Sequence, residues 1–248
     1  MSTSVAGIVL AAGAGTRLAP LTRQRPKALC PVGGTALVDL AEARVRAVTE
    51  TVAVNVHHGR EALLAHLGDR VHVSLEDPEP LGTAGAVGAL RDWLDGRPAV
   101  IVNADGWCVG GLDRLLEGWD GERVRILLPG GGDFKAQSMI AGSLLPWALA
   151  QTIEARPAGL YEAVWRRALA QGTLETVAFP GPFVDCGNPA AYLAANLAAS
   201  GGQSVVAPGA QVAGRVVRSV CWEDAVVGRD ETLVDAIRFS ERGTVLVR

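Results

Sequence analysis

Short β-branched runs alternate with helix-like patterns along the first half of this chain. Between the runs, Ala36–Val48 places its apolar side chains on one helical face, and Thr83–Leu94 begins with a residue suited to capping a helix. This alternation predicts an α/β fold, a Rossmann-like and mostly parallel sheet with helices on both faces. Ligands of such sheets bind outside the carboxyl ends of the strands. The runs expected to form buried strands are Val5–Leu10, Thr51–Val56, Val71–Leu75, Ala99–Asn103 and Val124–Leu128.

The second half continues the pattern and then changes character. From Ser138 to Ser200 the sequence predicts a strand, two helical stretches, a short strand at Phe183–Asp185 and a helix from Pro189. From Ser204 onward, single valines recur among Gly, Pro, Asp and Arg, which predicts short strands separated by turns. Two coils of a β-solenoid and an irregular β tail packed on the main domain both fit, because three repeats are normally needed to recognise a solenoid. We expect a main domain over residues 1–202 and a short C-terminal β-helix-like segment over residues 203–248.

Composition excludes several classes of protein. The 248 residues are 49% hydrophobic and 20% charged, which is typical of a globular chain. A net charge of −3 without a Lys/Arg-rich run argues against nucleic acid as a partner. The apolar stretch Val5–Ala14 is about half the length of a membrane span and has neither a charged leader nor a cleavage-site pattern, so we expect no membrane partner. Four widely spaced cysteines without a CxxC pair predict reduced thiols in a cytoplasmic protein.

A glycine-rich turn follows the first strand, and its backbone N–H groups could wrap phosphate oxygens. The sequence there runs Leu10-Ala-Ala-Gly-Ala-Gly-Thr-Arg17. A dinucleotide-binding fingerprint would need glycine in place of Leu18 and an acidic residue where the second strand ends in His57 and His58. A P-loop would need Gly-Lys-Ser/Thr, which the sequence lacks. The two histidines are adjacent on a strand and point to opposite faces, so we do not expect them to chelate a metal.

The longer sequence around these glycines is more specific for a protein family than the glycine-rich turn alone. GAGTRLAPLT followed by RPKALCPVGG closely resembles the signature of the sugar-1-phosphate nucleotidyltransferases, also called NDP-sugar pyrophosphorylases. NVHHG at Asn55–Gly59 is similar to the branch that includes mannose-1-phosphate guanylyltransferases and N-acetylmuramate-1-phosphate uridylyltransferases. The C-terminal segment is similar to the left-handed β-helix appended to several of these enzymes. Further matching segments are PLGTAG at Pro80–Gly85, VNADGW at Val102–Trp107 and FVDCGNPAAYLAAN at Phe183–Asn196.

The resemblance implies an enzyme that joins a nucleoside triphosphate to a sugar 1-phosphate, with release of pyrophosphate. Unit charges ~4 Å apart near a protein surface repel by about 4 kcal/mol, so two anionic substrates need cations between them. The resemblance assigns this work to Arg17 on the β- and γ-phosphates and to Lys27 on the α-phosphate. It assigns Asp105 and Asp185 to a bound Mg²⁺ or Mn²⁺. The implied nucleotide-binding residues are Leu10, Ala11, Ala12, Gly13, Gly15, Thr16, Pro80, Gly82, Thr83 and Ala84.

The chain also departs from the family pattern. Many members carry a Glu-Lys-Pro stretch whose lysine holds the sugar phosphate, and here a glycine-rich loop at Pro129–Gln137 replaces it. We expect Lys135 in this loop to take over that role, beside Gly142 and Asn103 on the sugar side. A non-catalytic nucleotide-sugar-binding relative is the alternative, but retention of all four charged residues favours an enzyme. The sequence leaves open the base, the sugar and whether the chain forms a homo-oligomer.

Overall fold

A computed structural model describes residues 4–247, so residues 1–3 and 248, at the ends of the two expected domains, lie outside it. The chain divides into two compact units. The sheet unit holds the chain up to Gly13 together with Val38–Phe183, and the signature unit holds Ala14–Leu37 together with the chain from Val184. The expected domain boundary after residue 202 stays a prediction. Among residues 4–247, every helix is too short or too polar to cross a bilayer.

The sheet unit is built on seven strands in the order β10-β8-β9-β6-β1-β4-β5. Strand β1 pairs in parallel with β4 and with β6, β4 pairs in parallel with β5, and β8 pairs in parallel with β10. Only β9 reverses direction within this sheet, running antiparallel to both β6 and β8. The expected mostly parallel sheet is therefore confirmed. The strands are β1 (Ala6–Leu10), β4 (Val52–Val56), β5 (His72–Leu75), β6 (Ala99–Asn103), β8 (Val124–Pro129), β9 (Gly142–Leu145) and β10 (Leu174–Phe179).

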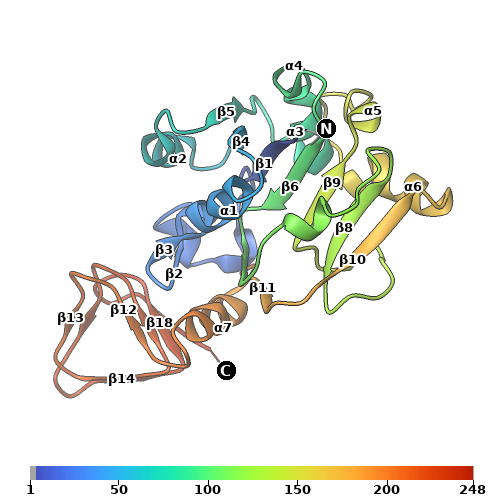
Figure 1. The fold of residues 1–248 in the computed structure, drawn as a ribbon. Helices are drawn as coiled ribbons and strands as arrows, with labels where there is room; N and C mark the ends of the chain where they lie inside the picture. The colour runs from blue at the N-terminus through green and yellow to red at the C-terminus, as the bar shows by residue number, and fades with distance from the viewer. Residues whose placement is uncertain (1–3, 248) are drawn as a thin grey trace. The chain divides into compact units, whose positions relative to one another are not determined.

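Helices cover both faces of this sheet (Figure 1). A Cβ at Gly7 of β1 would lie 1.9 Å from Val45 Cγ1, so the absence of a side chain lets α1 pack closely on that face. The next residue, Ile8, belongs to a buried cluster with Val87 of α3. Neighbouring strand residues point to opposite faces, so α1 and α3 lie on opposite sides. The helices of this unit are α1 (Leu37–Arg46), α2 (Arg60–Leu67), α3 (Gly82–Ala89), α4 (Arg91–Leu94), α5 (Trp147–Ala150) and α6 (Arg166–Ala170), with α1 starting at the unit boundary.

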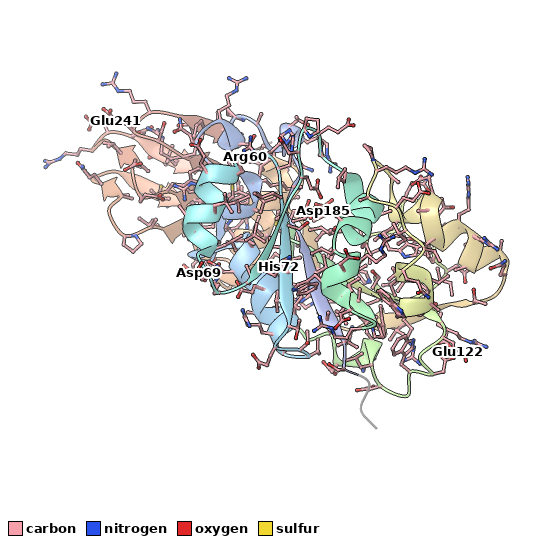
Figure 2. All side chains as sticks on the ribbon, turned by 90° about the horizontal axis from the view of Figure 1, so that it is seen from above. Arg60, Asp69, His72, Glu122, Asp185 and Glu241 are labelled. Atoms are coloured by element: carbon pink, nitrogen blue, oxygen red, sulfur yellow. The ribbon has the colours of Figure 1, made fainter. Side chains whose placement is uncertain are left out.

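Two elements differ from expectation. The helix expected over Thr83–Leu94 is interrupted at Leu90, which leaves α3 and the short α4. The sequence does not predict β10, which forms at the edge of the sheet with only Phe179 fully buried. Two further short strands lie outside the seven-stranded sheet, β7 (Gly106–Cys108) and β11 (Phe183–Asp185), the second as expected. Figure 2 labels Arg60, at which α2 begins, and Asp69, just beyond its end.

The signature unit begins with three short 3₁₀ turns at Thr16–Leu18, Leu21–Arg23 and Lys27–Leu29. A hairpin of β2 (Pro31–Val32) and β3 (Thr35–Ala36) follows. Helix α7 (Pro189–Ala199) starts where expected, because the Asn188 side chain accepts a hydrogen bond from the Ala191 backbone N–H at 3.0 Å.

The C-terminal segment folds as stacked turns. β12 pairs in parallel with β15, β13 with β16, and β14 with β17, so each turn lies on the one before it. Figure 1 shows these strands along three sides of a triangle. This confirms the short C-terminal β segment and selects coils over an irregular tail, whereas the left-handed twist stays a prediction. The strands are β12 (Val205–Val206), β13 (Gln211–Val212), β14 (Arg215–Val217), β15 (Val220–Cys221), β16 (Val226–Val227), β17 (Thr232–Val234), β18 (Ala236–Arg238) and β19 (Thr244–Leu246).

Candidate active site

The carboxyl ends of three parallel strands meet at one edge of the sheet unit. Leu10 at the end of β1 lies opposite Asn55 of β4 on one side and opposite Asn103 of β6 on the other. Beyond β6, the Ala104 backbone N–H donates to the Leu10 carbonyl at 2.9 Å. The half-buried Asp105, an expected metal ligand, follows directly. This is the edge at which parallel α/β sheets bind ligands.

A buried polar network joins two of the expected nucleotide-binding segments. Asn55 Oδ1 accepts from the Ala11 backbone N–H at 2.7 Å, and Asn55 Nδ2 donates to Glu76 Oε1 at 2.7 Å. Glu76 Oε2 accepts from the Leu81 backbone N–H at 2.7 Å. Asn55 is 3% exposed and Glu76 is 2% exposed. The network therefore fixes the turn after β1 against the segment Pro80–Gly85.

The sequence analysis missed both side chains of this network. A signal was present, because Asn55 is a polar residue within the apolar run of a strand expected to be buried. Buried polar groups need partners, so such an asparagine predicts a hydrogen-bonded network, although not which residues complete it.

The glycines of α3 are explained by close packing. Gly82, Gly85 and Gly88 lie on one face of the helix, and a Cβ on any of them would come within 2.6 Å of backbone atoms in the segment Glu154–Ala158. Side chains at these positions would push that segment away. The spacing of these glycines therefore has a structural cause within the sheet unit, and the expected contact of Gly82 with a nucleotide stays a prediction.

The neighbouring residues of α3 hold the same segment. Thr83 Oγ1 accepts from the Leu160 backbone N–H at 2.8 Å, and the Ala84 backbone N–H donates to the Ala158 carbonyl at 2.9 Å. Pro80 is exposed at the start of this region. The proposed nucleotide contacts of these three residues remain predictions.

A cavity of about 230 Å³ opens beside the ends of β1, β6 and β9. Four expected site residues line it: Leu10 and Thr83 from the nucleotide set, and Asn103 and Gly142 from the sugar set. Lys135 is exposed and is not among the residues that line this cavity. Its expected role toward the sugar phosphate therefore stays a prediction.

The two histidines after β4 face different partners. His57 Nδ1 lies 2.9 Å from the Glu76 carbonyl, whereas the His58 backbone N–H reaches the Ala12 carbonyl at 3.5 Å. His58 Nδ1 is buried and has no hydrogen-bond partner in the part of the chain that the structure describes. Burial, and then the neighbouring His57, lower the pKa of His58 below its ordinary value, so the neutral ring is favoured.

Within the signature unit, three expected site residues lie together. Lys27 is 9% exposed, and its Nζ lies 4.0 Å from Asp185 Oδ1. A Cβ at Gly187 would lie 2.9 Å from Arg17 Nη2 and 3.1 Å from Asp185 Oδ1. Two cations therefore surround one partly exposed carboxylate, which leaves a local positive charge suited to phosphate groups. Figure 2 labels Asp185.

The first glycine of this unit also has a structural requirement. Gly15 has a φ of +64°, a conformation that residues with a side chain rarely adopt. A Cβ there would also lie 2.8 Å from Lys27 Cβ. Thr16, the next residue, is exposed at the start of the first 3₁₀ turn. Gly15 thus lets the turn pass close to Lys27, and contacts of Gly15 and Thr16 with a nucleotide stay predictions.

Helix α7 and the C-terminal coils hold the segment that carries Lys27. The Tyr192 hydroxyl donates to the Pro31 carbonyl, and Asn196 Oδ1 accepts from the Gly33 backbone N–H at 3.1 Å. Trp222 Nε1 donates in turn to the Tyr192 hydroxyl at 3.0 Å. Burial raises the pKa of Tyr192 far above its ordinary value, so this hydroxyl remains a neutral donor.

The donor set suits a metal that is shared with phosphate. No group of three or more His, Cys, Asp or Glu side chains that could hold a metal occurs within residues 4–247. The expected ligands supply one carboxylate from each unit, Asp105 and Asp185. Mg²⁺ prefers oxygen ligands and commonly takes one or two carboxylates while substrate phosphates and water complete its shell. Each aspartate could supply a carboxylate to a magnesium–phosphate complex, and the binding of one ion by both stays a prediction.

Comparison with known proteins identifies the family. The model of the family described as "Nucleotidyl transferase" matches residues 6–123. The N-acetylmuramate α-1-phosphate uridylyltransferase of Caulobacter vibrioides is 30% identical, in a match that covers 76% of this chain and 94% of that protein. The chain belongs to the nucleotidyl transferase family. The family expected from the signature is thereby confirmed.

Other relatives of this nucleotidyl transferase differ in the base they use. The mannose-1-phosphate guanyltransferase of Pichia angusta is 33% identical, over 45% of this chain and 33% of that protein. A Bacillus anthracis crystal structure, assigned as a glucose-1-phosphate thymidylyltransferase, superposes with a TM-score of 0.68 at 18% identity. It covers 79% of this chain and 95% of that one, and at this identity it establishes the shared fold alone. The expected α/β architecture is confirmed by this likeness as well.

Proposed function

We propose that the chain transfers a nucleotidyl group from a nucleoside triphosphate to a sugar 1-phosphate. An oxygen of the sugar phosphate forms a bond to the α-phosphorus, and the bond from that phosphorus to the β-phosphate oxygen breaks. The products are an NDP-sugar and pyrophosphate. The attacking oxygen is already anionic at neutral pH, so the reaction needs charge neutralisation and alignment, with no protein nucleophile.

The observation that carries this proposal is the cluster of Arg17, Lys27 and Asp185 in the signature unit. Arg17 is exposed and presents a planar fork suited to the β- and γ-phosphates. Lys27 is almost buried, so its charge acts where little water screens it. We assign Lys27 to the α-phosphate, at which negative charge must be stabilised as the oxygens exchange.

The proposal includes a divalent metal. We assign its protein ligands to Asp105 and Asp185, because their carboxylates suit Mg²⁺ or Mn²⁺ when phosphate supplies the other oxygens. When bound, the ion would neutralise phosphate charge. Each aspartate is half-buried, so each retains contact with solvent from which a metal–nucleotide complex arrives.

The chemistry of the substrates also supports a cellular location for the proposed activity. Nucleoside triphosphates and sugar phosphates are intracellular metabolites, and Cys30, Cys108 and Cys221 form no disulfide within residues 4–247. We therefore place the activity in the cytoplasm. The relative that matches along most of its own length is a uridylyltransferase, so UTP is the first nucleotide to assay.

The test is a grid of four nucleoside triphosphates against a panel of sugar 1-phosphates with Mg²⁺, scored by pyrophosphate release. Lys27→Ala should lower kcat by about 10²–10³, the usual loss when one preorganised donor to a developing oxyanion is removed. Arg23→Ala, an exposed cation on the neighbouring 3₁₀ turn, is the matched control and should retain the parent rate. Nucleotide binding without pyrophosphate release from any pair would instead establish a non-catalytic binding protein.

A further inference from the structure

One wall of the cavity beside β6 and β9 is formed by residues that the sequence does not predict as site residues. Glu162 and Trp165 both line it, from the π-helix Tyr161–Trp165. π-Helical turns are rare and occur frequently at functional sites. Here the turn places a carboxylate and an indole, three residues apart in the sequence, beside one cavity.

Residues of this turn that line the cavity carry polar groups. Trp165 Nε1 is buried and has no hydrogen-bond partner among residues 4–247. Its ring is held in place by an edge-to-face contact with Phe134, at a centroid distance of 5.6 Å. Buried N–H donors are normally satisfied, so a ligand that supplied an acceptor to this one would gain a hydrogen bond.

The Glu162 carboxylate folds over a glycine in the same cavity wall. A Cβ at Gly159 would lie 2.4 Å from Glu162 Oε2, so only the absence of a side chain there admits this placement. Glu162 is itself exposed, and its side chain forms no hydrogen bond or ion pair within residues 4–247. Its oxygens can therefore accept from hydroxyl groups.

The charges of the lining restrict the class of ligand. Glu162 is the one charged side chain among the residues that line the cavity, and none of them is Lys or Arg. An anionic phosphate would be repelled by this carboxylate and stabilised by no cation. The remaining lining is apolar or neutral, including Ile101, Ile140 and Leu160. The cavity therefore suits a neutral, hydroxylated ring with one apolar face, and a phosphate group on the same ligand must lie outside the cavity.

The volume agrees with this class. Pockets for drug-sized ligands hold roughly 300–1,000 Å³, so a cavity of about 230 Å³ is suited to a group the size of a single sugar ring. Its position on the β6–β9 side of Leu10 also separates it from the buried Asn55–Glu76 network, which lies on the β4 side of the same residue.

We propose that the turn Tyr161–Trp165 recognises the sugar ring of the substrate. The Glu162 carboxylate accepts a hydrogen bond from one ring hydroxyl, and the Trp165 indole N–H donates to a ring or substituent oxygen. Gly159 leaves the space in which the carboxylate lies. This inference rests on the proposed function, because it takes the sugar 1-phosphate as the ligand. It makes Glu162 and Trp165 specificity-determining residues of the reaction.

The first experiment compares Michaelis constants for both substrates in the full-length protein. Glu162→Gln should raise KM for the sugar 1-phosphate by about tenfold, because glutamine keeps an acceptor oxygen but loses the charge that strengthens the hydrogen bond. Trp165→Phe keeps a ring and removes only the N–H donor, so KM should rise by about two- to tenfold. KM for the nucleoside triphosphate should not change in either variant. Glu154→Gln, an exposed carboxylate outside the cavity, is the matched control.

The second experiment separates a lost contact from a disturbed fold. A series of monodeoxy glucose 1-phosphates, or the corresponding analogues of the best sugar found, is assayed with parent and Glu162→Gln. The analogue that lacks the hydroxyl bound by Glu162 should have the same KM in both proteins, whereas the other analogues should retain the difference. Gly159→Ala should mimic Glu162→Gln, because the added methyl group displaces the carboxylate. Equal losses for every analogue, or a parallel rise in the KM of the triphosphate, would overturn the proposal.

Failure of the proposed function can be distinguished from failure of this inference. If no pair of substrates releases pyrophosphate, the proposed catalysis is wrong, and binding of glucose 1-phosphate and N-acetylglucosamine 1-phosphate is then measured by calorimetry. Binding that is weakened by Glu162→Gln and not by Glu154→Gln would support the sugar site without catalysis. Binding that is unaffected by Glu162→Gln, or absent for a panel of sugar phosphates, would refute the site.

Discussion

Substituting Glu76 by glutamine tests whether the buried network positions the two nucleotide-binding segments. The Glu76 carboxylate accepts from two donors, Asn55 Nδ2 and the Leu81 backbone N–H, each at 2.7 Å. Glutamine has almost the same shape but offers one oxygen and one NH₂ group. Asn55 cannot relieve the mismatch by turning its amide over, because its Oδ1 accepts from the Ala11 backbone N–H. One donor must therefore face another donor.

The magnitude follows from the burial of these groups. Leaving one buried donor unpaired costs about 1–3 kcal/mol, and the surviving bond loses its charge assistance. We expect Glu76→Gln to lower the free energy of unfolding by about 3 kcal/mol, which corresponds to a melting temperature lower by about 6–12 °C in a chain of this size. Loss of these hydrogen bonds should also weaken binding of the nucleoside triphosphate, because the network would no longer hold the turn after β1 against the segment Pro80–Gly85.

Thermal unfolding followed by circular dichroism measures the first effect, and calorimetric titration with the nucleoside triphosphate measures the second. Glu79→Gln removes an exposed carboxylate from the same connection and serves as the control. If Glu76→Gln and Glu79→Gln had the same melting temperature, the network would contribute no stability. Lower stability with unchanged nucleotide affinity would refute its positioning role and leave only a structural one.

Three further predictions concern other parts of the chain. Gly187→Ala should raise KM for the triphosphate, because its methyl group would displace Arg17 and Asp185, and steady-state kinetics matching the parent would contradict this. The pKa of His58 is lower in the folded protein than its ordinary value. The neutral His58 ring therefore contributes its full stabilisation above about pH 6.5, and this stabilisation is lost as the pH falls through the pKa of the folded state. His58→Gln should therefore show a melting temperature that falls less between pH 7 and pH 5, and parallel curves for parent and variant would exclude this role. Iodoacetamide at pH 8 should modify native protein mainly at Cys108, the one cysteine that is not buried, and slowly because burial raises the pKa of that thiol. Mass spectrometry showing faster modification at Cys30, whose pKa is raised by burial to about 12, would contradict the structure.

The centre of the sheet could be predicted because its strands are buried on both faces. Such strands appear in the sequence as short apolar runs, and β1, β4 and β6 were recognised on that basis. The edge strand β10 gives a weaker signal, since most of its side chains retain exposure to solvent and it directly follows a helix. Its strand conformation depends on pairing with β8, which is distant in the sequence.

The candidate site was predictable only where its residues form a contiguous signature. Arg17 and Lys27 stand in one string with recognisable spacing, whereas Glu76 acquires its importance from a partner 21 positions earlier. The turn Tyr161–Trp165 was missed for a related reason. Its sequence is an ordinary amphipathic helical pattern, and a single sequence does not show that Glu162 and Trp165 line a cavity together with the ends of distant strands.

The signature also contains a cation whose role could not be assigned from its position. Arg25 lies between Arg17 and Lys27, yet its guanidinium stands 4.3 Å from the centre of the Trp222 ring and pairs with Glu223. Burial raises the pKa of Glu223, but hydrogen bonds from its own backbone N–H and from Arg25 outweigh burial, so the pKa lies below its ordinary value.

This pairing changes how the C-terminal coils should be understood. A tail that served only in assembly would leave the signature segment unaltered when removed. In the signature unit, however, the second coil supplies Trp222 and Glu223, and these residues hold Arg25 and, through Tyr192, the Pro31 carbonyl. Lys27 lies on the short stretch between those two anchors, and its low exposure depends on that stretch remaining folded. The coils therefore contribute to the electrostatic environment of Lys27, because they hold the stretch that keeps its charge out of bulk water.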